Sequence, residues 1–236
     1  MKDKVVFITG GSEGYGKAAA KLFADRGAKV VIAARTESKL IKAQDETGAD
    51  SIVCMDVTSA QDWENIALEH VKTRYGRLDV LINNAGGAIN VGSLANQTTQ
   101  TIDQVIALNL NSVIYGSQVF GRMMTKQGSG TIINVASVCA KQAWPGWSLY
   151  AAAKWGVLGF SKNLYVEVQP FGVRVTCLLP GAGATDFMQN AGSENMDMQM
   201  QPIDVAQAML SICTLPPHVA VEEMTVTGID QIIVPL

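Results

Sequence analysis

Val5-Val6-Phe7-Ile8-Thr9-Gly10-Gly11-Ser12-Glu13-Gly14-Tyr15-Gly16 is the stretch that decides the fold. Its apolar half predicts a buried strand over 4–8, its glycines a tight turn, and the pattern over 17–26 a helix. A run rich in Val and Ile predicts a second strand over 29–34. Such a unit places a nucleotide pyrophosphate at the helix N-terminus. The alternative is a glycine-rich loop without a ligand, and the strand–turn–helix context weakens it.

The rest of the chain repeats this alternation. Further strands are predicted over 51–55, 78–82, 131–135 and 173–179, with one or two more within 225–235; further helices are predicted over 36–46, 60–75, 98–126 and 202–215. Alternating strands and helices favour an α/β fold with a doubly wound parallel sheet. Because no linker, repeat or low-complexity tract interrupts residues 1–236, we expect a single domain.

Composition narrows the classes of function. The 236 residues are 48% hydrophobic and 17% charged, with a net charge of −3, so a disordered chain is excluded. No basic block suggests a nucleic-acid partner, and no apolar run suits a signal peptide or a membrane span. Four scattered cysteines and two distant histidines argue against a disulfide framework and a metal site. We therefore expect a cytoplasmic protein with no membrane partner and no bound metal.

Tyr150 and Lys154 form a candidate catalytic pair. Side chains four positions apart share one face of a helix, about 6 Å from each other. A nearby ammonium favours the phenolate, so we expect Lys154 to lower the pKa of Tyr150 from its ordinary value of about 10. Such a phenol exchanges a proton with an alcohol or carbonyl oxygen, which Ser137 would hold. Alone, the Y-x-x-x-K spacing is weak, because half-buried packing and a solvated lysine also satisfy it.

Polar residues follow several predicted strands, at the edge where parallel sheets bind ligands. Asp56 follows the strand over 51–55 and suits either an adenine amino group or the cap of the next helix. The run Asn83-Asn84-Ala85-Gly86-Gly87 is either a plain polar turn or a cofactor contact. Asn109, within the predicted helix over 98–126, marks either a kink with a usable carbonyl or a solvated position.

Residues 182–201 are irregular and rich in methionine. Methionine side chains are flexible and adapt to varied apolar surfaces. We interpret this segment as a substrate lid that becomes ordered when ligands bind, and a disordered loop is the alternative.

Together these motifs resemble the short-chain dehydrogenase/reductase family over nearly the whole chain. Thr9 to Gly16 matches its T-G-x-x-x-G-x-G turn, Asn83 to Gly86 its N-N-A-G, and Pro180-Gly181 with Thr185 its P-G-x-x-x-T. Its catalytic tetrad corresponds to Asn109, Ser137, Tyr150 and Lys154. Several motifs in the right order and spacing make chance agreement negligible.

The resemblance implies a Rossmann-type sheet of seven parallel strands in three α/β/α layers, a nicotinamide dinucleotide cofactor, and a homo-oligomer, either a tetramer or a dimer. It implies that Tyr150 is the general acid/base, that Lys154 lowers its pKa and holds the nicotinamide ribose, that Ser137 positions the substrate oxygen, and that Asn109 holds a relay water. The implied cofactor contacts at the pyrophosphate are Gly10, Ser12, Gly14, Tyr15 and Gly16, and those at adenine are Asp56 and Val57. The implied contacts at the ribose are Asn83, Ala85 and Gly86. Tyr150 and Lys154 are also implied cofactor contacts, and those at the nicotinamide are Pro180, Gly181 and Thr185.

The end of the second predicted strand bears on the choice of cofactor. An acid there binds the ribose 2′-hydroxyl of NAD, whereas an arginine suits the 2′-phosphate of NADP. The strand here ends Ala33-Ala34-Arg35, so NADP is favoured and NAD is the alternative. Glu13 in the glycine turn counts against NADP, unless it pairs with Arg35.

Two departures from the family leave the substrate open. Tyr15 replaces the usual isoleucine in the glycine turn and either covers the cofactor or fills space. The C-terminus lacks the usual paired glycines and is more similar to members such as serine dehydrogenases, which hints at a small polar hydroxy or keto substrate. An apolar pocket is suggested instead by Cys139, Trp144, Trp147 and Met188, with Ser137 and Tyr150 as the remaining substrate contacts.

Three functions are compatible with these residues. The first is an NADP-dependent oxidoreductase that interconverts an alcohol and a carbonyl compound. The second is a nucleotide-binding regulatory protein that has lost turnover, and the third is an epimerase or dehydratase that leaves no net change in the cofactor.

Overall fold

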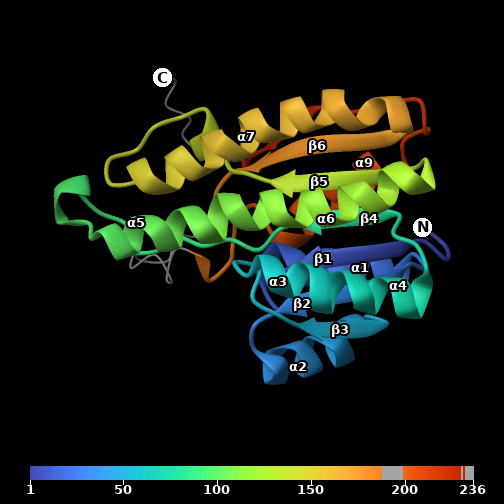
Figure 1. Cartoon of the computed structure of the whole chain (residues 1–236). Helices are drawn as coiled ribbons and strands as arrows, with labels where there is room; N and C mark the ends of the chain where they lie inside the picture. The colour runs from blue at the N-terminus through green and yellow to red at the C-terminus, as the bar shows by residue number, and fades with distance from the viewer. Residues whose placement is uncertain (188–198, 230, 232–236) are drawn as a thin grey trace.

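A parallel sheet forms the centre of the computed structural model, which describes residues 1–187, 199–229 and 231 (Figure 1). Within these residues seven strands pair in the order β3-β2-β1-β4-β5-β6-β7. The strands are β1 Val5–Thr9, β2 Lys29–Ala34, β3 Ser51–Cys54, β4 Val80–Asn83, β5 Gly130–Val135, β6 Val173–Pro180 and β7 Glu223–Val226. The order reverses between β1 and β4, which is the point where such sheets bind nucleotides. The predicted α/β fold with a doubly wound parallel sheet is confirmed.

Helices cover both faces of the sheet. On one face lie α1 Gly14–Asp25, α2 Glu37–Thr47 and α9 Pro202–Thr214, and on the other α4 Glu69–Tyr75, α6 Ser112–Gln127 and α7 Ser148–Val168. Two of the predicted helices contain a π-helical turn, at Trp63–Leu68 after α3 Ala60–Asp62 and at Ala107–Asn111 after α5 Thr99–Ile106. Such π turns, with hydrogen bonds from i to i+5, occur as single-turn bulges inside α-helices, often at functional sites. The apolar pattern of the sequence predicts both segments as continuous helices.

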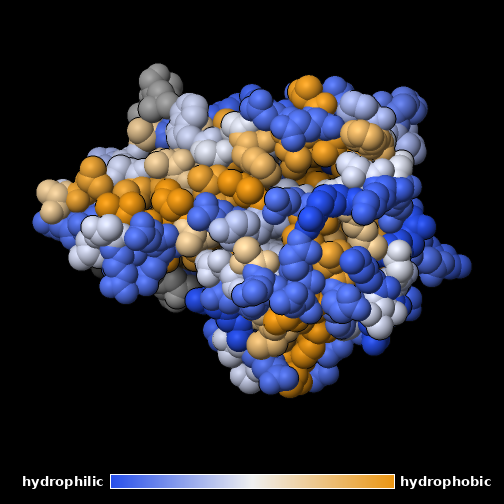
Figure 2. All heavy atoms as spheres, viewed as in Figure 1, coloured by the Kyte–Doolittle hydropathy of each residue, from blue (hydrophilic) through white to orange (hydrophobic). Residues whose placement is uncertain are grey.

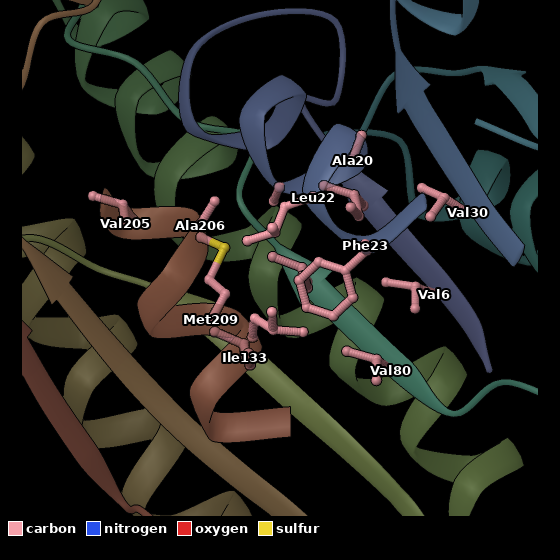
Figure 3. Packing of buried hydrophobic residues seen from close by; sticks show 14 of the residues in the cluster. Val6, Ala20, Leu22, Phe23, Val30, Val80, Ile133, Val205, Ala206 and Met209 are labelled. Carbon is pink, nitrogen blue, oxygen red and sulfur yellow. The ribbon is translucent and has the colours of Figure 1, made fainter. Parts of the chain in front are cut away.

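The alternation of side chains along β1 divides the core in two. Val6 and Ile8 pack with α1 and α9, whereas Val5 and Phe7 pack on the opposite face. Figure 3 shows Phe23 of α1 in the first layer, with Val6 on one side and Met209 of α9 on the other. All three side chains are completely buried. Burial of each such side chain stabilises the fold by about 1.5–3 kcal/mol.

An aromatic trio anchors the second layer. Phe7 of β1 and Phe120 of α6 have ring centroids 5.1 Å apart, and Trp63 lies edge-on to Phe120 at 6.2 Å. The indole Nε1 of Trp63 donates a hydrogen bond of 2.9 Å to the carbonyl of Val57. This bond ties the loop after β3 to the core, and the loop carries Val57 into the groove described below.

Several predictions fall on residues outside the described ranges. They are Met188, most of the lid proposed over 182–201, and most of the strands expected within 225–235; β7 itself begins slightly earlier, at Glu223.

In the described part of the chain, no helix has the length and apolarity needed to cross a bilayer. No cluster of three or more potential metal ligands occurs among the same residues. The four cysteines are free thiols.

Candidate active site

A groove of about 740 Å³ opens at the carboxyl ends of β1, β4 and β5, within the size range of ligand pockets. It is lined by these predicted site residues: Gly10, Ser12, Gly14, Tyr15, Arg35, Val57, Ala85, Gly86, Ser137, Cys139, Trp144, Trp147, Tyr150, Lys154, Pro180, Gly181 and Thr185. Segments far apart in the sequence therefore meet in one groove. Of the other predicted residues, Gly16, Asp56, Asn83 and Asn109 do not line it, and Met188 lies outside the described residues.

The glycine turn brings backbone to the groove wall. Gly10 and Gly14 have φ of +64° and +52°, which side-chain-bearing residues rarely adopt. A Cβ on Gly16 would lie 2.3 Å from the carbonyl oxygen of Gly10, so only glycine lets α1 approach β1 this closely. Glu13 is the N-cap of α1, and its side chain makes no capping hydrogen bond. The first N–H groups of α1 are thus available to an anion, which suits a dinucleotide pyrophosphate.

Asn84, and not Asn83, faces the groove. The side chain of Asn84 donates to the carbonyl of Thr9 at 2.9 Å, and the Thr9 hydroxyl accepts from the backbone of Asn84 and Ala85, each at 2.9 Å. These bonds join the loop after β4 to the glycine turn. Asn83 is completely buried and donates to Asn134 at 2.8 Å and Ser117 at 3.0 Å. As the last residue of β4 it points between sheet and helix, so a ribose contact by its side chain does not fit.

Asp56 is occupied within its own loop. Its Oδ1 accepts hydrogen bonds from the backbone N–H and the hydroxyl of Thr58, at 2.9 and 2.8 Å. The cap of the next helix is Ser59, whose hydroxyl accepts from the backbone of Asp62. Asp56 does not itself line the groove, whereas the neighbouring Val57 does, and the adenine contact of the Asp56 carboxylate stays a prediction.

Two cations lie at the end of the groove next to β2. Arg35, in the loop before α2, and Lys39, in the first turn of α2, both line the groove. Glu13 pairs with Lys39 at 2.6 Å, so the predicted pairing with Arg35 is wrong. Arg35 is exposed and forms no ion pair within the described residues. Sequence reasoning missed Lys39, although Arg35-Thr36-Glu37-Ser38-Lys39 places a second cation one helical turn after the first.

Tyr150 and Lys154 lie in the first two turns of α7, both almost completely buried. The Nζ of Lys154 lies 5.4 Å from the centroid of the Tyr150 ring and donates a hydrogen bond of 3.0 Å to the carbonyl of Val135. Ser137 follows β5, and its hydroxyl accepts from the backbone N–H of Cys139 at 3.2 Å. The end of β5 thus holds Lys154 through the Val135 carbonyl and carries Ser137 to the same end of the groove as the Tyr150 phenol.

Burial controls the pKa values of this pair. It raises the pKa of Tyr150 above its ordinary range, and the opposing effect of the Ser137 hydroxyl is smaller. It also lowers the pKa of Lys154 to about 8. The predicted lowering of the Tyr150 pKa is therefore wrong for the protein as the structure describes it, because removal from water is the largest influence on the phenol and raises its pKa. At neutral pH the phenol is protonated and most of Lys154 is still an ammonium.

Asn109 lies in the π turn between α5 and α6 and is completely buried, so the solvated alternative is wrong. Its amide accepts from the backbone N–H of Gly87 at 3.1 Å and donates to the Gly87 carbonyl at 2.9 Å. A Cβ on Gly86 would lie 3.0 Å from Asn109 Oδ1 and 3.3 Å from Lys154 Nζ. Asn109 therefore lies behind the loop that separates it from the groove, beside the Lys154 ammonium.

The loop after β6 covers the glycine turn. The Tyr15 hydroxyl donates to the carbonyl of Gly181 at 3.2 Å, and burial raises the pKa of Tyr15 to about 12. A Cβ on Gly14 would lie 3.6 Å from the Thr185 methyl. Tyr15 thus lines the groove and also ties α1 to the loop after β6.

The far end of the groove is aromatic. Trp144 and Trp147 line it beside Tyr150, as predicted, and Phe187 joins them from the loop after β6. Sequence reasoning missed Phe187, because a single aromatic in an irregular segment carries no periodic signal.

The fold and the site define a class: an α/β protein with a doubly wound parallel sheet, whose groove at the strand ends joins a glycine turn to a buried tyrosine and lysine. The family model described as short chain dehydrogenase matches residues 4–196, and the chain belongs to this family of oxidoreductases. An uncharacterized oxidoreductase of Staphylococcus saprophyticus is 34% identical over 243 residues, covering 98% of each protein. Family membership supports a nicotinamide cofactor.

Two solved structures of similar fold support the family assignment. An alcohol dehydrogenase from the archaeon Thermococcus sibiricus, complexed with 5-hydroxy-NADP, has a TM-score of 0.86 and 26% identity, covering 98% of each chain. A metagenomic short-chain oxidoreductase in complex with NADP has a TM-score of 0.85 and 26% identity, covering 97% of this chain and 98% of that one.

Proposed function

We propose that the protein interconverts an alcohol and a carbonyl compound, with NADP(H) as hydride carrier. The observation that carries the proposal is the position of the Tyr150 phenol, with Lys154 behind it and Ser137 beside it, in the same groove as an uncapped helix N-terminus. Proton transfer and dinucleotide binding are thereby combined in one site.

The residues of the chain handle the proton. The nicotinamide cofactor, when bound, supplies a hydride to the carbonyl carbon or removes one from the alcohol carbon. During reduction Tyr150 donates its proton to the carbonyl oxygen, since burial keeps the phenol protonated. Ser137 donates a hydrogen bond to the same oxygen, where negative charge develops. The Lys154 ammonium stabilises the phenolate that remains, and oxidation reverses these steps. The relay water at Asn109 stays a prediction.

NADP is the cofactor that the ribose end of the groove supports. The guanidinium of Arg35 can bind a 2′-phosphate through two parallel hydrogen bonds. Lys39 neutralises Glu13, which removes the repulsion that the sequence suggested. The two NADP-bound relatives of similar fold add support.

The test is turnover. NADPH is incubated with the protein and a panel of ketones and aldehydes, and its absorbance is followed. Loss of absorbance that depends on both protein and carbonyl compound supports an oxidoreductase. Binding of NADPH without turnover of any carbonyl or alcohol would favour the regulatory protein. Conversion of a substrate without net loss of NADPH would favour an epimerase or dehydratase.

We also propose that the protein works in the cytoplasm as a single domain and as a homo-oligomer, either a tetramer or a dimer. Figure 2 shows an apolar band over the region where α6 and α7 lie together, which supports association. Light scattering of the purified protein measures the assembly.

A further inference from the structure

The catalytic phenol belongs to a cluster of three rings. Trp147 precedes α7, Tyr150 lies in its first turn, and Phe187 comes from the loop after β6. Ring centroids are 5.5 Å apart for Trp147 and Tyr150, 5.7 Å for Tyr150 and Phe187, and 6.3 Å for Trp147 and Phe187. The planes of Trp147 and Phe187 differ by only 16°, and both meet Tyr150 edge-on. We call these three side chains the aromatic cluster.

The aromatic cluster still offers surface to a ligand. All three rings line the groove, and Trp147 and Phe187 are only half-buried. A general acid must lie about 2.6–3.2 Å from the oxygen it protonates. Since the other two rings lie within 6 Å of the phenol ring and line the same groove, they are within reach of the group attached directly to the carbonyl carbon. Aromatic rings associate with such faces and edges more strongly than saturated rings of the same size do.

Charge at this end of the groove disfavours an anionic substrate. Among the described residues that line the groove, Arg35 and Lys39 lie at the ribose end, and Lys154 is held by the Val135 carbonyl. Lys141, nearby in the chain, pairs with Glu223. Asp186 is exposed and lines the groove next to Phe187. A substrate carboxylate would therefore meet a negative charge and find no free cation.

The sequence extends this argument beyond the described residues. Residues 175–236 contain seven aspartates or glutamates and no lysine or arginine. The segment 188–198, whatever its position, therefore brings no cation to the substrate.

We propose that the substrate is an uncharged ketone or secondary alcohol with an aryl group on the carbonyl carbon, and not a keto or hydroxy acid. The inference rests on the proposed function, and it decides between the polar and apolar substrates that the sequence left open.

The inference can be tested by measuring ligand binding, without any turnover. An alcohol cannot react with the reduced cofactor, so calorimetry of NADPH-loaded protein compares three unreactive ligands: 1-phenylethanol, 1-cyclohexylethanol and mandelate. We expect 1-phenylethanol to bind about tenfold more tightly than 1-cyclohexylethanol, because only the flat ring pairs with the aromatic cluster. Mandelate, which carries a carboxylate in place of the methyl group of 1-phenylethanol, should bind most weakly. Equal binding of the two alcohols, tightest binding of mandelate, or no binding of 1-phenylethanol would overturn the inference.

Substitutions in the aromatic cluster test which side chains give the preference for 1-phenylethanol. Trp147→Leu and Phe187→Leu should each reduce the preference for 1-phenylethanol several-fold while binding of 1-cyclohexylethanol stays nearly constant. Trp155→Leu is the matched control, because Trp155 lies on the same helix, is 47% exposed and does not line the groove. A preference that survives both cluster variants would contradict the assignment. Acetophenone that is not reduced by NADPH despite the expected binding order would instead refute the proposed function.

Discussion

Tyr150 and Lys154 are both removed from water, and burial shifts their pKa values in opposite directions. Desolvation disfavours the charged form of each group: it keeps the phenol neutral and brings the ammonium close to losing its proton. The sequence places the two residues on one helix face, but it does not reveal how deeply they are buried. For this reason the pairing was predictable and the direction of the tyrosine shift was not.

The pH dependence of carbonyl reduction follows from Lys154. Its pKa of about 8 means that the ammonium is present below this value and is lost as the pH rises through it. We therefore expect kcat/KM for reduction to be constant near neutral pH and to fall above about pH 8. A steady-state pH profile measures this, with the unfolding temperature followed over the same range as a control. A rate that does not fall until far above pH 9 would show that Lys154 does not control it.

We expect Arg35 to set a preference for a phosphorylated cofactor. Arg35→Ala removes charge-assisted hydrogen bonds to the 2′-phosphate, so we expect NADPH to bind about 10- to 100-fold more weakly, with little change for NADH. Titration of the protein with each cofactor gives both dissociation constants. Lys42→Ala is the control, because Lys42 is an exposed cation of α2 that does not line the groove. An equal loss of affinity for the two cofactors would refute the role of Arg35.

At the scale of elements, the glycine turn packs the start of α1 closely against the loop after β1. Gly16→Ala places a Cβ 2.3 Å from the Gly10 carbonyl oxygen and 2.6 Å from the Asn84 amide. We expect a loss of about 1–3 kcal/mol in the free energy of unfolding, with weaker NADPH binding, because the turn must move.

Gly159 supplies the control for this substitution. It lies inside α7, and a Cβ there would meet no atom within 4 Å. Gly159→Ala should therefore stabilise the protein by about 0.5–1 kcal/mol through helix propensity. Urea denaturation measures both variants. If Gly16→Ala were as stable as the unaltered protein, the steric account of the turn would be wrong.

Whether a helix or strand could be predicted depended on how clearly the sequence pattern marks it. Strand β2 lies over 29–34 as predicted, because its Val-Ile run is bounded by Gly27 and Arg35. The π turn at Asn109 was not predicted from the apolar pattern, and only the unfavourable asparagine within a helix hinted at an irregularity there. At the end of β4 the choice between Asn83 and Asn84 depended on a side-chain direction that the motif does not reveal.

For the whole molecule, the doubly wound parallel sheet and the groove at its strand ends followed from local signals, because repeated βαβ units leave few topologies. The substrate end of the groove could not be predicted from local signals. It combines the loop after β5, the start of α7 and Phe187, which are brought together only by tertiary packing. Charge is also divided over the whole chain: all lysines and arginines precede residue 175. The cations that line the groove are therefore Arg35, Lys39 and Lys154, and residues 175–236 add no lysine or arginine to it.

The central claim is that Tyr150 exchanges a proton with the substrate, and a single-turnover measurement tests it most directly. Tyr150→Phe removes only the hydroxyl, so hydride transfer from NADPH to the best ketone should slow by about 100-fold or more, with unchanged NADPH affinity. Tyr165→Phe, on the same helix but outside the groove, should react at the rate of the unaltered protein. Hydride transfer at a near-normal rate in Tyr150→Phe would contradict the account.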